Sequence, residues 1–286
     1  MQAYYPEFVE PVRTLGQRTF DFRQHIVVMA IVNRTPNSGL DPNRSMVLEE
    51  TIETARRAVE QGAEWIDVGG RAYRPGQPLS TEDEIGRVVP VIRGIREITD
   101  AVISVDTHLP EVAEASYKVG ADVVNDTNGL RAPGMVELVA ETGMGAVITH
   151  SQSGPANPDV RVPYGDVVQD VRDYLEQRVS VAREAGIRAD RLYIDPGHDL
   201  NKETPESMEV TRRLAEIASL GYPLVAACSN KDFIESSLQA ERGSDAVRMG
   251  TITANTVCAY QGARIVRVHD VAANVAAMRT VEMLLF

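Results

Sequence analysis

Short apolar runs alternate with longer segments of helical period along the whole chain. Each run is too short for a helix and lacks strict apolar–polar alternation, as expected of strands that are buried on both faces. The runs are Ile26–Val32, Trp65–Val68, Val102–Val105, Val123–Val124, Ala146–Ile148, Leu192–Ile194, Leu224–Ala227 and Ile265–Val268. The amphipathic segments, which predict helices, are Met46–Gln61, Glu82–Ile98, Val112–Val119, Met135–Glu141, Val167–Ala185, Ser207–Ala218, Ala246–Tyr260 and Val271–Leu285.

Turn and cap residues agree with this division. Thr81 and Glu84 have the spacing of a capping box, and Pro110 suits the first turn of a helix. A glycine follows six of the predicted helices, where a left-handed residue ends a helix at little cost; these are Gly62, Gly120, Gly143, Gly186, Gly221 and Gly262.

Eight strand–helix units in 286 residues favour a (β/α)8 TIM barrel over a doubly wound sheet. No linker or low-complexity tract divides the chain, so we expect a single domain. The barrel is expected over residues 26–286, and residues 1–25 are expected to form an N-terminal extension packed on it.

Composition and net charge limit the classes of partner that we expect for this chain. A net charge of -12 argues against nucleic acid or an anionic membrane surface as a partner. The longest apolar run, Ile26–Val32, is far short of the ~20 residues that cross a bilayer. Cys228 and Cys258 form no disulfide framework, and the first residues do not resemble a leader. We therefore expect a cytoplasmic protein.

A polar residue lies at or just after the end of every predicted strand. In a barrel these ends meet at one face, where catalytic residues lie. The positions, in strand order, are Asn33, Asp67, Asp106, Asn125–Asp126, His150, Asp195, Ser229–Lys231, and Arg267 with His269.

These groups suit two kinds of ligand. Asp106, Asn125 and Asp195 can exchange hydrogen bonds with a flat amino-substituted heterocycle. Lys231, Arg267 and His269, with Asn33, suit phosphate oxygens.

Other chemistries fit less well. The first strand ends in Val32-Asn33-Arg34 instead of the His-x-His of a metal-dependent hydrolase, and no His-Glu-x-x-His occurs. Ser151 is not in a Gly-x-Ser-x-Gly turn. Neither a tight zinc catalytic site nor a serine triad is expected.

With these residues identified, the chain resembles the dihydropteroate synthase family over nearly its whole length. The segments that carry the resemblance are Met29-Ala-Ile-Val-Asn33-Arg-Thr-Pro36, Gly62-Ala-Glu-Trp-Ile-Asp67-Val-Gly-Gly70, Arg74-Pro-Gly76, Ile103-Ser-Val-Asp106-Thr107, Val124-Asn125-Asp126, Asp195-Pro-Gly197, Ser229-Asn-Lys231 and Arg267-Val-His-Asp-Val271. Their order and placement at strand ends make the resemblance specific.

The resemblance implies a barrel enzyme that is usually a homodimer. It implies condensation of 6-hydroxymethyl-7,8-dihydropterin diphosphate with 4-aminobenzoate in folate biosynthesis, with release of diphosphate assisted by Mg²⁺. The implied mechanism is dissociative: the anionic diphosphate leaves before the aryl amine attacks the pterin-methyl cation.

The resemblance also assigns roles to residues. Asp106, Asn125, Asp195 and Lys231 are expected to bind the pterin. The expected diphosphate ligands are Asn33, Arg74, Arg267 and His269, with Asn33 near the Mg²⁺, and the expected catalytic set is Asp106, Lys231, Arg267 and His269.

The sequence departs from the family on the side of the second substrate. Asn37-Ser38-Gly39 replaces the family's Asp-Ser-Phe in the first loop, and Arg71-Ala72-Tyr73 replaces Glu-Ser-Thr in the second. Asp232 follows Lys231 where the family has serine. Arg71, Tyr73 and Ser229 are expected to line an altered acceptor pocket.

Two alternatives stay open. One is a divergent paralogue that binds pterin but uses another amine acceptor or has no activity. The other is a pterin-dependent methyltransferase barrel, against which the Arg267–His269 pair argues.

Four further residues are interpreted as structural or left outside the site. Asp67 is interpreted as a brace for the Gly69–Gly70 loop, His150 as a satisfied histidine of the barrel mouth, and Cys228 as an inert strand residue. Lys202 matches a lysine of the family motif. The apolar end of the last helix, Val281–Phe286, predicts a dimer interface.

Overall fold

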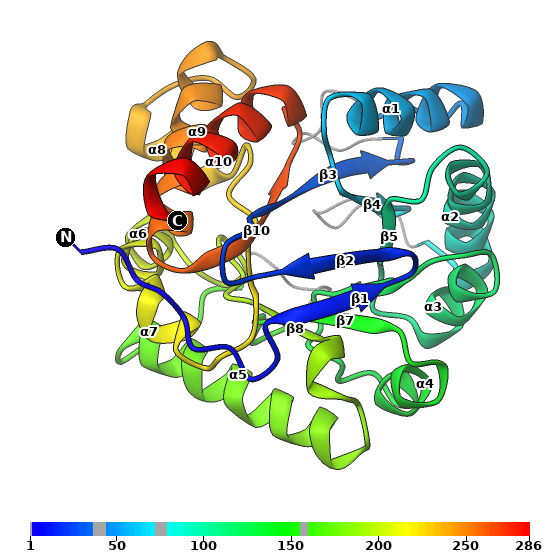
Figure 1. Ribbon diagram of the computed structural model, residues 1–286, viewed down its shortest axis with the longest axis horizontal. Coiled ribbons are helices and arrows are strands. Elements are labelled where there is room, and N and C mark those ends of the chain that lie inside the picture. Colours follow the sequence, from blue (N-terminus) through cyan, green and yellow to red (C-terminus); the bar gives the residue numbers. More distant parts are fainter. Residues whose placement is uncertain (1, 37–43, 72–78, 155–159) are drawn as a thin grey trace.

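In the computed structural model the eight predicted strands close into a parallel barrel, with helices around its outside (Figure 1). The structure describes all residues except 1, 37–43, 72–78 and 155–159. The strands pair in the order β10-β3-β4-β5-β6-β7-β8-β9. They are β3 (Val27–Asn33), β4 (Trp65–Gly69), β5 (Val102–Asp106), β6 (Val123–Asp126), β7 (Gly145–Thr149), β8 (Leu192–Asp195), β9 (Leu224–Ala226) and β10 (Ala263–Val268). The prediction of a single-domain (β/α)8 barrel is confirmed.

The helices lie close to the predicted segments, with two differences. They are α1 (Leu48–Glu60), α2 (Thr81–Arg96), α3 (Pro110–Tyr117), α4 (Met135–Thr142), α5 (Val167–Glu184), the 3-10 helix η1 (Ala189–Arg191), α6 (Thr204–Arg212), α7 (Leu214–Ala218), α8 (Asp232–Leu238), α9 (Asp245–Tyr260) and α10 (Val271–Leu285). The single helix expected over Ser207–Ala218 is divided at Arg213, whose φ of -109° and ψ of 23° leave the helical region. The apolar pattern does not predict α8, because seven residues are too few to show a helical period.

The caps agree with the prediction except at α2. The six glycines predicted to end helices all have positive φ, between 70° and 108°, and Pro110 lies in the first turn of α3. The predicted capping box at Thr81 is wrong: Ser80 is the N-cap of α2, and its hydroxyl accepts a hydrogen bond from the Asp83 amide. The Glu84 side chain instead contacts Arg71 and Thr107.

An antiparallel hairpin of β1 (Val12–Leu15) and β2 (Arg18–Asp21) covers the amino-terminal end of the barrel. Leu15 of β1, Phe20 of β2 and Phe22, which follows β2, pack with Trp65 and Tyr193 in one buried cluster, the hairpin cluster. The Phe22 and Tyr193 rings lie 6.0 Å apart, edge to face. The hairpin thereby keeps water from the apolar lower half of the barrel interior.

The barrel interior changes from apolar to polar along the strands. The outward residues pack against the helices as one large core, while the inward apolar residues join the hairpin cluster. Because side chains alternate across a strand, the inward positions run from the hairpin to the opposite mouth. The inward series are Trp65–Asp67–Gly69, Val102–Ser104–Asp106, Val123–Asn125, Tyr193–Asp195 and Ile265–Arg267–His269.

Apolar side chains remain exposed at the end of α10. Met283 and Leu284 are 84% and 79% exposed, and Phe286 is 46% exposed. No helix in the described part of the chain is long and apolar enough to span a membrane.

Replacement of Phe22 by alanine tests the role of the hairpin. Because Phe22 is fully buried in the hairpin cluster, Phe22→Ala should lower the free energy of unfolding by about 3–5 kcal/mol. Urea unfolding measures the loss. Val9→Ala, at an exposed position of the same extension, should change it by less than ~0.5 kcal/mol. Equal effects of the two variants would show that the hairpin does not stabilise the barrel.

Candidate active site

Arg267 joins three strands at the centre of the barrel mouth. Its Nε donates a hydrogen bond to Asp67 Oδ2 at 2.6 Å, and its Nη2 donates to Asp106 Oδ2 at 2.8 Å. Burial raises the pKa of the Asp106 carboxyl, and the Arg267 charge opposes this rise. The contacts use two of the five guanidinium N–H groups, so Arg267 can also bind a ligand.

Asp67 contributes more than the loop brace that the sequence suggested. Its Oδ2 accepts hydrogen bonds from Arg267 and, at 3.2 Å, from Asn125 Nδ2. Its buried Oδ1 has no hydrogen-bond partner within the described residues. The signal in the sequence was its inward position two residues before Gly69, where a charged residue on a buried strand needs a partner.

Asn33 lies beside this network at the end of β3. Asn33 pairs in register with Gly69, and Gly69 pairs with Asp106. A Cβ at Gly69 would lie 2.4 Å from Asn33 Oδ1, so only glycine leaves space for the amide. The first predicted phosphate ligand is thus held next to the carboxylates at the mouth.

Asp195 and Lys231 form a buried pair of opposite charge on the other side of the mouth. Asp195 Oδ1 accepts a hydrogen bond of 2.7 Å from the Gly197 amide, and Lys231 Nζ donates to the His198 carbonyl. Burial raises the pKa of Asp195, while the charge of Lys231 lowers it. The pair offers an acceptor and a donor on one wall, as reading a heterocycle edge requires.

Lys202 is buried beneath this wall. Its Nζ lies 2.8 Å from His150 Nδ1 and donates to the Gly197 carbonyl at 3.0 Å. Burial, and then the charge of Lys231, lower the pKa of Lys202 to about 7. Burial and the Lys202 charge also hold the pKa of His150 well below its usual value. His150, which we left outside the site, is therefore a neutral neighbour of a lysine that titrates near neutrality.

His269 lies with Ser229 on the β9–β10 side. Ser229 Oγ and His269 Nδ1 are 2.9 Å apart, and both line a cavity of about 370 Å³ with Asn230 and Arg248. Burial and the Arg267 charge lower the pKa of His269 to about 3. The histidine is neutral at pH 7, so it offers a hydrogen bond to an anion, and the positive charge comes from Arg267.

Arg71 makes a structural ion pair. Its Nη2 lies 2.7 Å from Oε2 of the fully buried Glu84, and Thr107 Oγ1 donates to Glu84 Oε1 at 2.7 Å. The pair explains why Glu84 does not cap α2. The other two residues predicted in these loops, Tyr73 and Arg74, lie outside the described residues.

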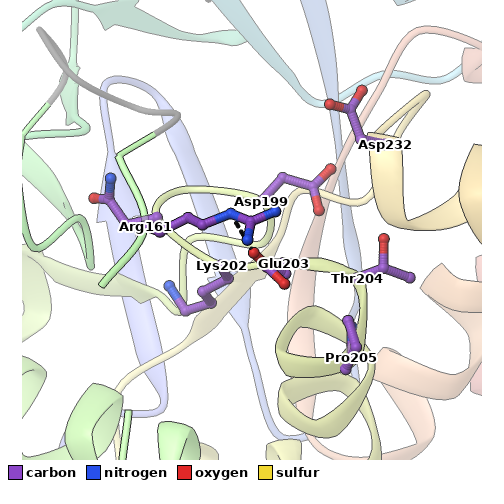
Figure 2. Close-up of a pocket in the computed structure, with 8 residues that line it drawn as sticks. Arg161, Asp199, Lys202, Glu203, Thr204, Pro205 and Asp232 are labelled. Atoms are coloured by element: carbon purple, nitrogen blue, oxygen red, sulfur yellow. Dashed lines mark ion pairs between the residues drawn. The ribbon is translucent and has the colours of Figure 1, made fainter. Parts of the chain in front are cut away.

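A second cavity, of about 490 Å³, is lined by residues from the segments that follow β7, β8 and β9 (Figure 2). Its lining is mostly polar: Arg161, Asp199, Asn201, Lys202, Glu203, Thr204, Pro205 and Asp232. Arg161 is paired with Glu203, as Figure 2 shows. Asp232 is paired with Arg242, which does not line the cavity. The sequence does not predict this cavity, because Arg161 and Asp232 lie near residues 199–205 only in the folded chain.

A barrel with these polar groups at its carboxyl-terminal mouth matches the family model described as pterin binding enzyme, over residues 29–269. The chain belongs to this family, and its relatives place it with the dihydropteroate synthases. It is 37% identical to the dihydropteroate synthase of Escherichia coli strain K12 over 259 residues, which are 90% of this chain and 91% of that one. The resemblance stated from the motifs is confirmed.

Other relatives are named differently. The chain is 39% identical over 263 residues to a Mycobacterium leprae protein named inactive dihydropteroate synthase 2, covering 90% of this chain and 89% of that one. It is 39% identical over 264 residues to a Haloferax volcanii protein named probable bifunctional folylpolyglutamate synthase/dihydropteroate synthase. That match covers 92% of this chain but 31% of the Haloferax protein.

A solved structure of Xanthomonas albilineans dihydropteroate synthase with 4-aminobenzoic acid has the same fold. It superposes with a TM-score of 0.87 at 34% sequence identity, covering 96% of this chain and 98% of that one.

Replacement of Lys202 by methionine tests the buried lysine–histidine contact. Because the Lys202 charge helps to depress the pKa of His150, Lys202→Met should raise that pKa towards 6.5. NMR of the His150 ring as a function of pH measures the change. Lys118→Met removes an exposed lysine of the surface pair with Glu114 and should leave His150 unchanged. The same His150 titration in both variants would contradict the contact.

Proposed function

We propose that this chain is a dihydropteroate synthase-type transferase. It condenses 6-hydroxymethyl-7,8-dihydropterin diphosphate with an aryl amine, 4-aminobenzoate in the first instance, and releases diphosphate. The observation that carries the proposal is the paired arrangement of the mouth, with the Asp195–Lys231 wall on one side and Arg267 between Asp67 and Asp106 on the other.

The two sides divide the substrate between them. Asp195 and Asn125 read the donors and acceptors of the pterin ring, and Lys231 donates to it. Arg267 stabilises the negative charge of the departing diphosphate, and the neutral His269 donates a hydrogen bond to it. Stabilisation of the separating charges inside a buried mouth is the main source of rate enhancement.

Mg²⁺ is part of the proposal, and the donor set fits it. Mg²⁺ prefers oxygen ligands and is usually held by one or two protein groups together with substrate phosphates and water. The amide oxygen of Asn33 offers such a ligand beside the arginine that we assign to the diphosphate. When bound, the ion would neutralise phosphate charge and help the diphosphate to leave.

A second candidate is a pterin-binding paralogue that uses a different amine or does not turn over, and the charges of the polar cavity favour it. The cavity next to Lys231 carries three carboxylates, Asp199, Glu203 and Asp232, against the cations Arg161 and Lys202. Since Lys202 has its pKa lowered to about 7, the cavity does not favour a carboxylate ligand. A relative named inactive has the same level of identity as the synthases. The methyltransferase alternative gains no such support.

Diphosphate release distinguishes these candidates. The protein is mixed with the pterin diphosphate and Mg²⁺, and then with either 4-aminobenzoate or its uncharged analogue 4-aminobenzamide. Amine-dependent release with 4-aminobenzoate is expected of the synthase. Release with 4-aminobenzamide but not with 4-aminobenzoate would indicate an acceptor without a carboxylate. Binding of the pterin diphosphate without release of diphosphate would indicate the inactive paralogue.

Asp195→Ala serves as the negative control for the pterin site. Loss of a hydrogen bond to a charged group costs ~1.5–3 kcal/mol, so calorimetry should show pterin diphosphate binding about 10- to 100-fold weaker. Asp173→Ala removes an exposed carboxylate on α5 and should bind like the unchanged protein. If the unchanged protein neither binds the pterin diphosphate nor releases diphosphate, the proposal is wrong.

A homodimer is the assembly we expect. The support is the exposed apolar end of α10, where Met283 and Leu284 lie side by side in sequence. Light scattering at micromolar protein should give twice the mass of one chain. Leu284→Asp should shift it to one chain, whereas Val181→Asp on α5 should not. A single-chain mass for the unchanged protein would contradict the dimer.

The cytoplasmic location stays a prediction of the sequence.

A further inference from the structure

Three metal-ligating side chains meet outside the proposed active site. His198 follows β8, Cys228 follows β9, and Cys258 lies in α9. All three are fully buried, and their ligand atoms lie within 4.8 Å of one another. Cys228 Sγ and Cys258 Sγ are 3.9 Å apart. These two are the only cysteines in the chain.

The hydrogen bonds of His198 leave its Nδ1 as the nitrogen with a lone pair. His198 Nε2 is 3.1 Å from Thr211 Oγ1, and the single hydroxyl proton of Thr211 is donated to the Ser207 carbonyl at 2.9 Å. Thr211 Oγ1 must therefore accept from Nε2–H, so the proton is on Nε2. Nδ1 is buried and makes no hydrogen bond of ordinary geometry within the described residues, although the His198 ring lies close enough to Cys228 to lower the pKa of that thiol. A metal-bound histidine has this form, with one nitrogen held by a neighbour and the other able to coordinate.

We propose that His198, Cys228 and Cys258 bind a Zn²⁺ ion. Zinc–sulfur bonds are about 2.3 Å, which places two thiolates on one tetrahedral ion about 3.8 Å apart; the observed sulfur separation is 3.9 Å. Two thiolates, a neutral imidazole and Zn²⁺ sum to no net charge, as a fully buried site requires. The equivalent Cu⁺ site would keep a buried negative charge.

The contact with Cys258 and burial raise the pKa of Cys228 well above its ordinary value. Because a cysteine binds zinc as a thiolate, the affinity of the site falls as the pH falls.

The site would fix the pterin-binding wall without contacting the substrate. The His198 carbonyl accepts the hydrogen bond from Lys231 Nζ, and Cys228 directly precedes Ser229 in the chain. An ion that joins His198 and Cys228 to Cys258 ties the loops after β8 and β9 to helix α9. It is a positioning site for Lys231, and its existence does not depend on which reaction the mouth performs.

The test measures metal content and cobalt spectra of the full chain. Chelator-treated protein incubated with Zn²⁺ and passed through a desalting column should retain about one ion per chain by atomic emission. With Co²⁺ it should show a sulfur-to-cobalt charge-transfer band, which can come only from Cys228 and Cys258. Cys258→Ser and His198→Gln should lose zinc retention, and His108→Gln, a histidine outside the cluster, should keep it.

The Co²⁺ spectrum of the unchanged protein decides the matter even if a cysteine variant does not fold. No charge-transfer band and no retained zinc would overturn the proposal, as would equal zinc retention by a folded Cys258→Ser variant. Formation of a Cys228–Cys258 disulfide in preference to metal binding would also overturn it.

Discussion

The structure of the barrel mouth depends on the buried pairing of Arg267 with Asp67 and Asp106. A lone charge at this depth would be strongly destabilising, but here the guanidinium donates to both carboxylates, so each charge has a partner of opposite sign. The pairing joins β10, β4 and β5, which lie on both sides of the strand β3 that closes the barrel. Removal of one partner would leave an uncompensated charge, so the network constrains the positions of the other mouth residues as well as any reaction there.

The barrel interior has one half that stabilises the fold and another that holds the candidate site. Its lower half is filled by Trp65, Tyr193 and the aromatic side chains of the amino-terminal hairpin, while its upper half holds the titratable groups. Since the lower half supplies apolar packing, the upper half can hold desolvated charges whose pKa values are displaced. The low pKa of His269 and the near-neutral pKa of Lys202 both result from burial in this upper layer.

The two substrate sides differ in how far they match the family. The wall of Asp195 and Lys231 and the arginine network retain the residue types expected for a pterin and a diphosphate. The loops outside these two groups differ more from the family, because Asp232 and Glu203 line the adjacent cavity and Arg71 is paired with Glu84. The family fold and a different second substrate are therefore compatible, since the reacting ends are supplied by different loops of one barrel.

The sequence by itself determined the fold and the polar character of the mouth. Apolar runs, helical periods and terminal glycines are local features, and the eight βα units follow from them together with the rule that strand ends share one face. Asn33, Asp106, Asn125, Asp195, Lys231 and Arg267 could be placed at the mouth in this way. The hairpin at the amino terminus was not predicted, because its two strands have four residues each and are defined by what they cover.

Only the tertiary structure decided which of these residues pair. Arg267 is 200 residues from Asp67 and 161 from Asp106 along the chain, and nothing local encodes that contact. In the closed barrel Lys202 is buried against His150, and His198 lies beside the two cysteines. Glu84, which the sequence suggested as part of a helix cap, is instead the partner of Arg71. Protonation states and ion pairs depend on burial and on neighbours distant in sequence, and these exist only once the strands have closed into the barrel.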